Sequence, residues 1–462
     1  MQLVAKKKTR IAGALGLMTA SLLAGVGASA QTGDEPITTR PAPVSANVQG
    51  NQGGTDFDDD TYTDEGMIRI DGAVLVYQED DGRVQAIEPV VGITYNFEDQ
   101  SSLSLKFTAD ILTGASPYGA TPWSQTQNLV DPPSTGASGS KGTTISTTDV
   151  PPDTLPLATG FNDQRYTVDM AYETPWGEGN TASISAGISR ERDYKSFYGG
   201  LGYSHEFNQK NTTFIASANF EYDISSPPGG HPTPLSVANG TLNEENRHKT
   251  VIGGLVGISQ VMNRRWLAQL NYNISTSSGY QTDPYRIVSV VDPVTGGPKR
   301  YLNEARPESR LRQSVYLGNK IALGSTVSDA SARVYHDDWG INSVTLNLAT
   351  KIPVTSRFYV KPGVRYYAQS AADFFNYYLV DGQTLPEFIS PDARLDKFSA
   401  FTGSLMAGYK TSKTGEIYAR ISRYEPSAKT DTSNAPGYLS NRDLFSGIGS
   451  TSMIIGYTYA FK

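Results

Sequence analysis

A strict alternation of apolar and polar side chains recurs along most of this chain. It is clearest over residues 102–112, where one set of positions holds Leu103, Leu105, Phe107, Ala109 and Ile111. The intervening positions hold Ser104, Lys106, Thr108 and Asp110. Because successive side chains of a β-strand point to opposite faces, a period of two predicts strands with one apolar and one polar face. The pattern returns over residues 182–189, 214–223, 266–274, 358–366 and 450–462.

The connections between these predicted strands alternate between short and long. The short ones are rich in Gly, Asn, Asp and Lys, which favour tight turns; they cover residues 98–101, 174–180, 208–211, 261–265, 323–326, 353–357 and 411–415. The long ones cover residues 113–160, 225–246, 276–307, 369–394 and 425–447. Short turns on one side and long loops on the other are typical of outer-membrane barrels. A soluble sandwich has no reason to sort its loops in this way.

The carboxyl-terminal strand carries a second signal. Its apolar face holds Met453, Ile455, Tyr457, Tyr459 and Phe461. Such an aromatic-rich last strand resembles the closing strand of bacterial outer-membrane barrels, although that signal usually ends on Phe and here Lys462 follows. Taken alone, the strand would also suit the edge of a soluble sandwich.

These patterns predict an all-β protein with a single antiparallel transmembrane β-barrel over residues 66–462. We expect about sixteen strands, short periplasmic turns and long extracellular loops. Pro89 lies within a predicted strand and cannot donate to its ladder, so we expect a bulge or local irregularity there. Trp176 and Trp266 lie on the short-turn side and Trp339 on the long-loop side, which predicts an aromatic girdle at the two membrane interfaces.

The composition agrees with a barrel. The chain has 462 residues, of which 38% are hydrophobic, and a mean hydropathy of -0.37. This is too polar for a helical membrane protein but suits a barrel with a polar inner face. There is no cysteine, so disulfides and thiolate chemistry are excluded. The formal net charge is -7 and no basic stripe is present, which argues against nucleic-acid binding.

The amino terminus predicts export. Residues 1–30 combine a basic start, an apolar run and a small-residue site ending at Ala30, as a secretory signal peptide does. A membrane anchor is the alternative. Residues 31–65 are acidic and lack hydrophobic periodicity, which predicts a flexible periplasmic segment. The run Asp56–Asp60 lacks the Gly and distal Glu of a calcium loop, so we interpret it as a solvated acidic run.

Charged residues on the predicted inner face are the candidate functional residues. We expect the lumen to be lined by Lys106, Asp110, Arg310, Arg312, Arg333, Lys361, Arg365 and Arg420. The expected extracellular rim contains Asp337, Asp338, Trp339 and Asp373. Two interpretations remain open: a basic ladder that attracts anionic solutes, or a salt-bridged interior that stiffens the barrel.

The sequence favours neither catalysis nor metal or cofactor binding. None of the four histidines has a familiar metal-ligand spacing to another ligand. Ser204 and His205 are adjacent, so they would point to opposite faces of a strand and could not act together in a hydrolase. We therefore expect no enzyme, cofactor or metal site.

Several segments together resemble an uncharacterised proteobacterial family of exported proteins, DUF3570. They lie at residues 112–122, 227–235, 285–292, 306–310, 336–341, 369–375 and 390–395. The resemblance implies no catalytic residue; it hints at redox-linked periplasmic partners. Because many of these segments lie in or beside long loops, we expect residues 113–122, 226–235 and 337–339 to fold together over the mouth or into the lumen. Disordered surface loops are the alternative.

The function that we expect is an outer-membrane passage for small hydrophilic solutes, with a lean toward anions. The expected location is the outer membrane of a Gram-negative bacterium, in contact with its lipid. The second hypothesis is a non-conducting structural barrel that docks a periplasmic partner. An outer-membrane hydrolase is a distant third.

Overall fold

A computed structural model describes residues 66–130, 147–238, 240, 242–430 and 432–462. The predicted signal peptide and the acidic segment 31–65 lie outside the described residues. No helix of the described residues is both long enough and apolar enough to cross a membrane.

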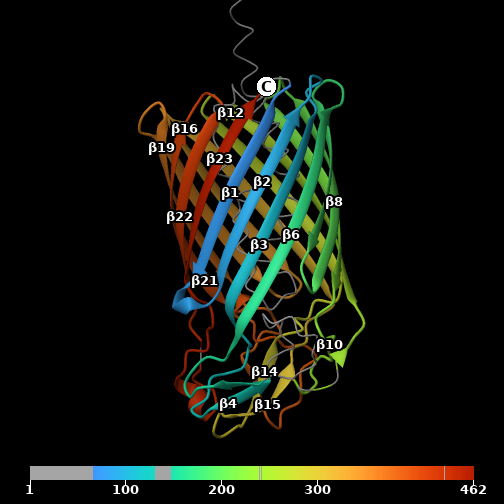
Figure 1. Cartoon of the computed structure of the whole chain (residues 1–462), viewed down its shortest axis with the longest axis vertical. Coiled ribbons are helices and arrows are strands. Elements are labelled where there is room, and N and C mark those ends of the chain that lie inside the picture. Colours follow the sequence, from blue (N-terminus) through green and yellow to red (C-terminus); the bar gives the residue numbers. More distant parts are fainter. Residues whose placement is uncertain (1–65, 131–146, 239, 241, 431) are drawn as a thin grey trace, which may run out of the picture.

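Sixteen antiparallel strands form one closed barrel, as predicted (Figure 1). Each barrel strand pairs with the barrel strands before and after it in the sequence, and the short strands of the loops lie outside the barrel. The barrel strands are β1 (Ile68–Glu79), β2 (Gln85–Asn96), β3 (Ser102–Pro117), β6 (Leu157–Pro175), β7 (Asn180–Arg190), β8 (Tyr194–Phe207), β9 (Thr212–Ser225), β12 (Arg247–Asn263), β13 (Trp266–Gly279), β16 (Ser309–Leu323), β17 (Thr326–Asp337), β18 (Asn342–Pro353), β19 (Phe358–Gln369), β21 (Phe398–Lys410), β22 (Gly415–Ser427) and β23 (Ser450–Phe461).

The last strand closes the barrel against the first. β23 pairs with β1 from Ile68 opposite Phe461 to Glu79 opposite Ser450. This pairing satisfies the backbone groups that two edge strands would otherwise expose, which is a requirement within a membrane. The aromatic face of β23 points outward, where Tyr457 and Tyr459 are both 47% exposed.

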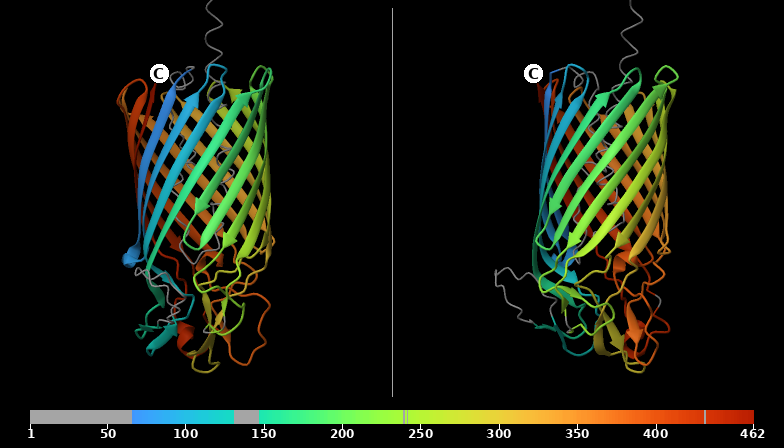
Figure 2. Two further views of the ribbon diagram at one scale, coloured as in Figure 1. Left: turned by 45° about the vertical axis from the view of Figure 1, so that its right-hand side comes forward. Right: turned by 90° about the vertical axis from the view of Figure 1, so that its right-hand side faces the viewer.

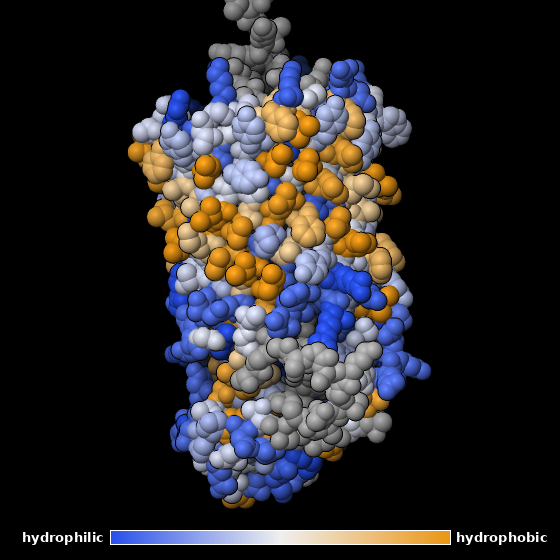
Figure 3. Space-filling view, in the orientation of Figure 1, coloured by the Kyte–Doolittle hydropathy of each residue, from blue (hydrophilic) through white to orange (hydrophobic). Residues whose placement is uncertain are grey.

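The outer wall is apolar and the inner wall polar, in the alternation that the sequence predicts. Leu105, Leu270 and Leu346, on three different strands, are each nearly half exposed on the outside. Figure 3 shows an orange band of hydrophobic residues across the visible face of the barrel, with hydrophilic residues above and below it. An exposed apolar band of this kind is stable only against lipid.

The long connections fold into a compact cap at one end of the barrel, whereas the strand connections at the other end, within the described residues, are short turns (Figure 2). The cap and the shorter connections of its side contain η3 (Asp80–Gly82), β4 (Gln127–Val130), β5 (Thr147–Val150), β10 (His231–Pro232), β11 (Leu242–Asn243), β14 (Ile287–Val291), β15 (Pro298–Asn303), β20 (Tyr378–Val380), η4 (Ala393–Leu395) and η5 (Gly437–Asn441). β14 lies between β15 and β20 in a three-stranded sheet.

Of two local expectations, one is met and one needs correction. Pro89 causes a local irregularity, although not a bulge: the β2–β3 pairing is interrupted between Ile87 and Val90 but resumes in the same register. The proline removes a donor without adding a residue to the strand. Trp339 is not part of an outer girdle, because its side chain is only 5% exposed. It points inward, where it packs against Ala372 and Leu395 and donates a hydrogen bond to Ser309 O.

Candidate functional site

The predicted lumen residues all lie on the inner face, opposite the exposed apolar positions of their strands. In β17, Arg333 alternates with outward Val334, and in β19, Arg365 alternates with outward Val364 and Tyr366. The other members are Lys106, Asp110, Arg310, Arg312, Lys361 and Arg420. The alternation alone puts them there, because a strand cannot place neighbouring side chains on one face.

Four of these residues form ion pairs along the inner wall. Lys106 Nζ lies 3.0 Å from Asp169, and Asp110 accepts a hydrogen bond from Arg165 Nη2 at 2.8 Å. Lys361 Nζ lies 3.0 Å from Asp329. Arg310 pairs with the rim residue Asp337. This part of the interior follows the salt-bridged interpretation.

Acidic residues predominate on one inner wall of the barrel and basic residues on the opposite wall, although Lys106 and Arg165 lie on the acidic wall and Asp329 lies on the basic one. The wall made by β16 to β22 holds Arg312, Lys320, Arg333, Lys361, Arg365 and Arg420. The wall made by β2 to β9 holds Glu88, Asp110, Asp163, Asp169, Glu173, Glu221 and Asp223. Since the strand order places β3 and β6 across the barrel from β17 and β18, the two walls face each other. The sequence analysis found most of the basic wall but missed most of the acidic one.

Two arginines of the basic wall differ from the rest. Within the described residues, neither Arg365 nor Arg420 makes an ion pair with an acidic side chain. Both are partly exposed on the inner face. Water also reaches the ion-paired groups, since Lys106 and Asp169 side chains are 26% and 27% exposed. The basic wall therefore holds two arginines that no acidic side chain of the described residues neutralises.

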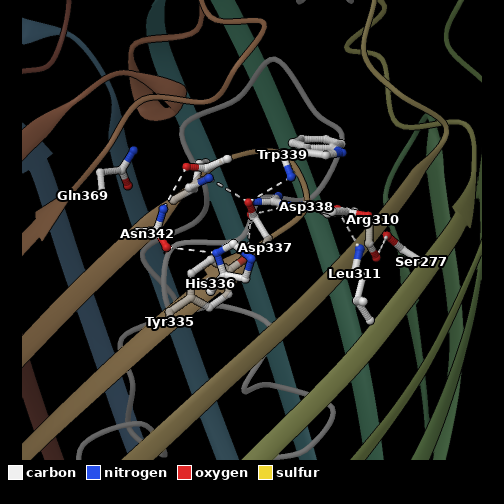
Figure 4. A network of polar contacts seen from close by, with 12 residues as sticks. Ser277, Arg310, Leu311, Tyr335, His336, Asp337, Asp338, Trp339, Asn342 and Gln369 are labelled. Carbon is white, nitrogen blue, oxygen red and sulfur yellow. Dashed lines mark hydrogen bonds and ion pairs between the residues drawn. The ribbon is translucent and has the colours of Figure 1, made fainter.

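Two of the four expected rim residues, Asp337 and Trp339, belong to a buried network instead of an exposed ring (Figure 4). Asp337 is fully buried and accepts hydrogen bonds from Arg310 Nε at 2.9 Å and Tyr335 Oη at 2.8 Å. The Arg310 guanidinium lies 4.2 Å from the centre of the Trp339 ring, whose Nε1 donates to Ser309 O at 2.8 Å. These contacts lock the β17–β18 turn onto β16.

The other two rim residues are exposed. Asp338 accepts a hydrogen bond from the backbone of Leu311 at 2.9 Å. The backbone N–H of Asp373 donates to Trp339 O at 2.8 Å, so the β19–β21 loop lies against the turn. Both residues are exposed, as expected of a rim.

A balanced ion network lies at the centre of the cap. Three acids, Asp283, Glu304 and Asp392, meet three arginines, Arg286, Arg306 and Arg394. Glu304 has no exposed surface and accepts hydrogen bonds from Asp283 N and Ser390 Oγ, both at 2.6 Å, and from Arg306 Nη2 at 3.3 Å. Arg306 Nε lies 2.7 Å from the same carboxylate as an ion pair. Arg306 Nη2 also donates to Asp392 at 3.0 Å. The network joins the β13–β16 loop to the β19–β21 loop.

The acids of this network titrate differently. Burial raises the pKa of Asp283 to about 7; Glu304 adds to the rise and Arg286 opposes it. Burial also acts to raise the pKa of Asp392, but Arg286, Arg394 and Arg306 outweigh it and hold that pKa well below its usual range. The attraction of neighbouring guanidinium groups, set against burial, decides whether the pKa of each acid is raised or lowered.

All three loop segments expected to fold together contact loops of the cap, and Trp339 of segment 337–339 packs with Ala372 and Leu395 of the β19–β21 loop. The backbone of Ile287 donates to Tyr118 O at 3.0 Å, and Thr121 N donates to Ser289 Oγ at 3.0 Å. From the β9–β12 loop, the His231 ring meets Tyr280 edge-on with 4.7 Å between centroids. Segments 113–122 and 226–235 thus pack on the β13–β16 loop.

A buried acidic trio lies where the cap meets the barrel. Asp163, Glu191 and Asp193 place carboxylate oxygens within 4.8 Å of one another. Oxygen donors of this kind suit a hard cation. Here Arg165 Nη1 lies 3.6 Å from Glu191, and the Tyr285 hydroxyl donates to Asp193. These contacts account for the trio as a docking point for the β13–β16 loop.

Ser204 and His205 point to opposite faces of β8. Ser204 is buried on the inner side, whereas His205 Nδ1 lies 2.9 Å from Asn180 Oδ1. No nucleophile–base contact joins them.

Comparison with known families decides which one the chain belongs to. Residues 45–459 match the family described as protein of unknown function DUF3570. The chain is a member of the DUF3570 family. No curated protein matches the chain.

Solved structures resemble this DUF3570 member in fold only. A ferric enterobactin receptor (PfeA) mutant from Pseudomonas aeruginosa is 11% identical, with 79% of this chain and 54% of that chain covered and a TM-score of 0.41. CdiB from Acinetobacter baumannii is 10% identical, with coverages of 85% and 60% and a TM-score of 0.45. A bacterial polysaccharide outer membrane secretin is 7% identical, with coverages of 87% and 99% and a TM-score of 0.43. The DUF3570 chain spans about half the length of the receptor structures that it matches. It is an outer-membrane type of barrel.

Proposed function

We propose that this barrel passes small hydrophilic solutes, preferentially anions, across the outer membrane of a Gram-negative bacterium, to which a signal peptide at residues 1–30 directs it. The observation that carries the proposal is the facing of a basic and an acidic inner wall. Opposite charges across a lumen create a transverse field that orients and attracts charged solutes. Arg365 and Arg420 supply positive charge on the inner face that no acidic side chain of the described residues pairs with.

The cap gives this passage a closed state. Loops from several strands pack together at the outer mouth around the Glu304–Arg306–Asp392 network. A cap held by buried ion pairs closes firmly, because removing one partner leaves a buried charge without compensation. The same cap supports the second hypothesis, a non-conducting barrel, so conductance is the measurement that distinguishes them.

The first experiment compares single-channel conductance in planar bilayers for the wild type and Glu304→Gln. The substitution removes a charge from the network and should weaken cap docking by about 3–5 kcal/mol. We expect longer or more frequent open steps than in the wild type. Arg300→Gln is the matched control, because its ion pair with Asp381 is exposed and such pairs contribute about 0–1 kcal/mol. Silence of wild type and Glu304→Gln alike would favour the non-conducting barrel.

The second experiment tests the basic wall. In a salt gradient, the reversal potential of an open channel reports anion preference. We expect Arg365→Gln combined with Arg420→Gln to move the preference toward zero, since these two guanidinium groups have no acidic partner among the described residues. Lys413→Gln, on an exposed periplasmic turn, should leave it unchanged. An unaltered reversal potential in the double variant would contradict the role of these arginines.

A further inference from the structure

We infer that the outward-facing rim of β7 and β8 binds the phosphate groups of lipids in the outer leaflet. Arg190 ends β7, Arg192 lies in the turn and Lys195 begins β8. All three side chains are exposed. Within the described residues none of the three makes an ion pair. Three positive charges therefore lie within six residues at the extracellular edge of the barrel.

The three residues sit directly beside the apolar belt. Arg190 and Lys195 are paired across the two strands, and the next outward pair toward the membrane is Ile188 with Phe197. Ile188 is 53% exposed and Phe197 is 47% exposed. In Figure 3, strongly hydrophilic side chains gather immediately below the orange band at the lower ends of β6 and β8. This is the depth at which lipid headgroups meet a barrel.

The pairing of Arg190 with Lys195 is unfavourable unless an anion joins it. Like charges directly opposite each other on an antiparallel pair destabilise it. The neighbouring acids give no relief, because Glu191 and Asp193 are buried and turned toward the Arg165 and Tyr285 contacts on the inner side. An external anion would remove the repulsion.

Another arginine at the same rim is neutralised by carboxylates of the chain itself. Arg423, in β22, also lies near the extracellular end. Its guanidinium pairs with both Asp80, at 2.5 Å, and Glu425, at 2.6 Å. The chain thus compensates one rim arginine with two carboxylates and leaves the β7–β8 cluster with none facing it.

The chemistry of the cluster fits a phosphorylated lipid. Guanidinium groups bind phosphate oxygens through two parallel hydrogen bonds, and a lysine adds a point charge. The neighbouring outward positions are Tyr166, opposite Arg190, and Ile224, opposite Lys195. Their apolar surfaces suit the acyl chains and sugar ring of a glycolipid and give nothing to a free anion. We therefore assign the site to lipid-borne phosphate.

The test is equilibrium binding of purified full-length protein in detergent to diphosphorylated lipid A. We compare the wild type with the triple variant Arg190→Gln, Arg192→Gln, Lys195→Gln. Loss of three charge-assisted contacts should weaken binding at least about tenfold. The charge-matched control is Arg264→Gln, Arg265→Gln, Lys413→Gln, which removes three exposed basic residues from the periplasmic turns and should bind as the wild type does. A difference in electrophoretic mobility between unheated and heated samples checks that the barrel of each variant is folded.

Two further arms identify the source of the phosphate. Dephosphorylated lipid A should bind the wild type as weakly as the triple rim variant binds the phosphorylated form. Inorganic phosphate at millimolar concentration should compete poorly. Equal binding by the wild type and the rim variant would overturn the assignment, as would equal loss in the periplasmic control. Full competition by inorganic phosphate would make this a soluble-anion site and would also refute it.

Discussion

At the scale of single residues, the cap depends on charges that have been taken out of water. Asp283, Glu304 and Asp392 are each at most 2% exposed. Such groups persist only with partners, since an isolated buried charge is costly. Arg310 is treated in the same way at the rim, with Asp337 on one side and the Trp339 ring on the other. Buried charged groups are thus paired with partners both in the cap and at the neighbouring rim.

The raised pKa of Asp283 predicts that cap docking depends on pH. Its folded-state pKa is about 7, above the unfolded value of about 3.9. A raised pKa contributes stability that is fully present at low pH and is lost as pH rises through 7. We expect slower hydrogen exchange of cap amides at pH 6 than at pH 8, after correction for intrinsic rates. Asp283→Asn should flatten this difference.

Asp392 provides the opposing trend. Its depressed pKa contributes stability above about pH 4 that is lost only in acid. The cap should therefore be most stable in mildly acidic solution. An Asp283→Asn variant with the same change between pH 6 and pH 8 as the wild type would show that another group carries the dependence.

At the scale of elements, the cap forms because loops of very different position in the chain pack closely. Gly119 marks the tightest point. Its φ is +93°, and a Cβ there would lie 2.5 Å from Pro391 Cγ and 2.6 Å from Ile287 O. No side chain fits between the β3–β6 loop and these two neighbours.

Gly119→Ala should therefore loosen the cap. Both the left-handed backbone and the clash oppose the added methyl group, and overpacking alone costs about 1–3 kcal/mol. We expect faster hydrogen exchange over 287–291 and 389–395. Gly82→Ala is the control, because Gly82 has φ +64° but open space around it. If both variants exchange alike, backbone strain and not loop packing would account for the effect.

At the scale of the whole molecule, the outward apolar belt predicts dependence on the bilayer. Leu270, near the middle of β13, is 48% exposed on the outside. Leu270→Arg should lower the free energy of unfolding by about 2–4 kcal/mol, as charges at mid-membrane do. Denaturant unfolding in phospholipid vesicles measures this. Asn347→Arg, on the inner face of β18, should cost less because its charge meets water. Equal losses of unfolding free energy in the two variants would show that the outer and inner faces meet the same environment.

Much of the barrel could be predicted because its signals are local. A period of two sets which side chain of β3 or β23 points outward, and tight-turn residues mark where strands reverse. Lys106 and Arg365 could be assigned to the inner face for the same reason. The family resemblance also pointed to the loop segments 113–122 and 226–235 that pack in the cap.

The sequence by itself determined the closed ribbon, its two faces and the sorting of its connections, since each follows from neighbouring residues along one strand or turn. Only the tertiary structure decided which charges meet. Arg306 and Asp392, which are hydrogen-bonded, lie 86 residues apart in the sequence. Trp339 points inward because it contacts the guanidinium of Arg310 and donates a hydrogen bond to Ser309 O, both on another strand. The closed strand order also decides that the acidic wall lies across the lumen from the basic wall. Contacts of this kind depend on register and loop packing, which no local pattern contains.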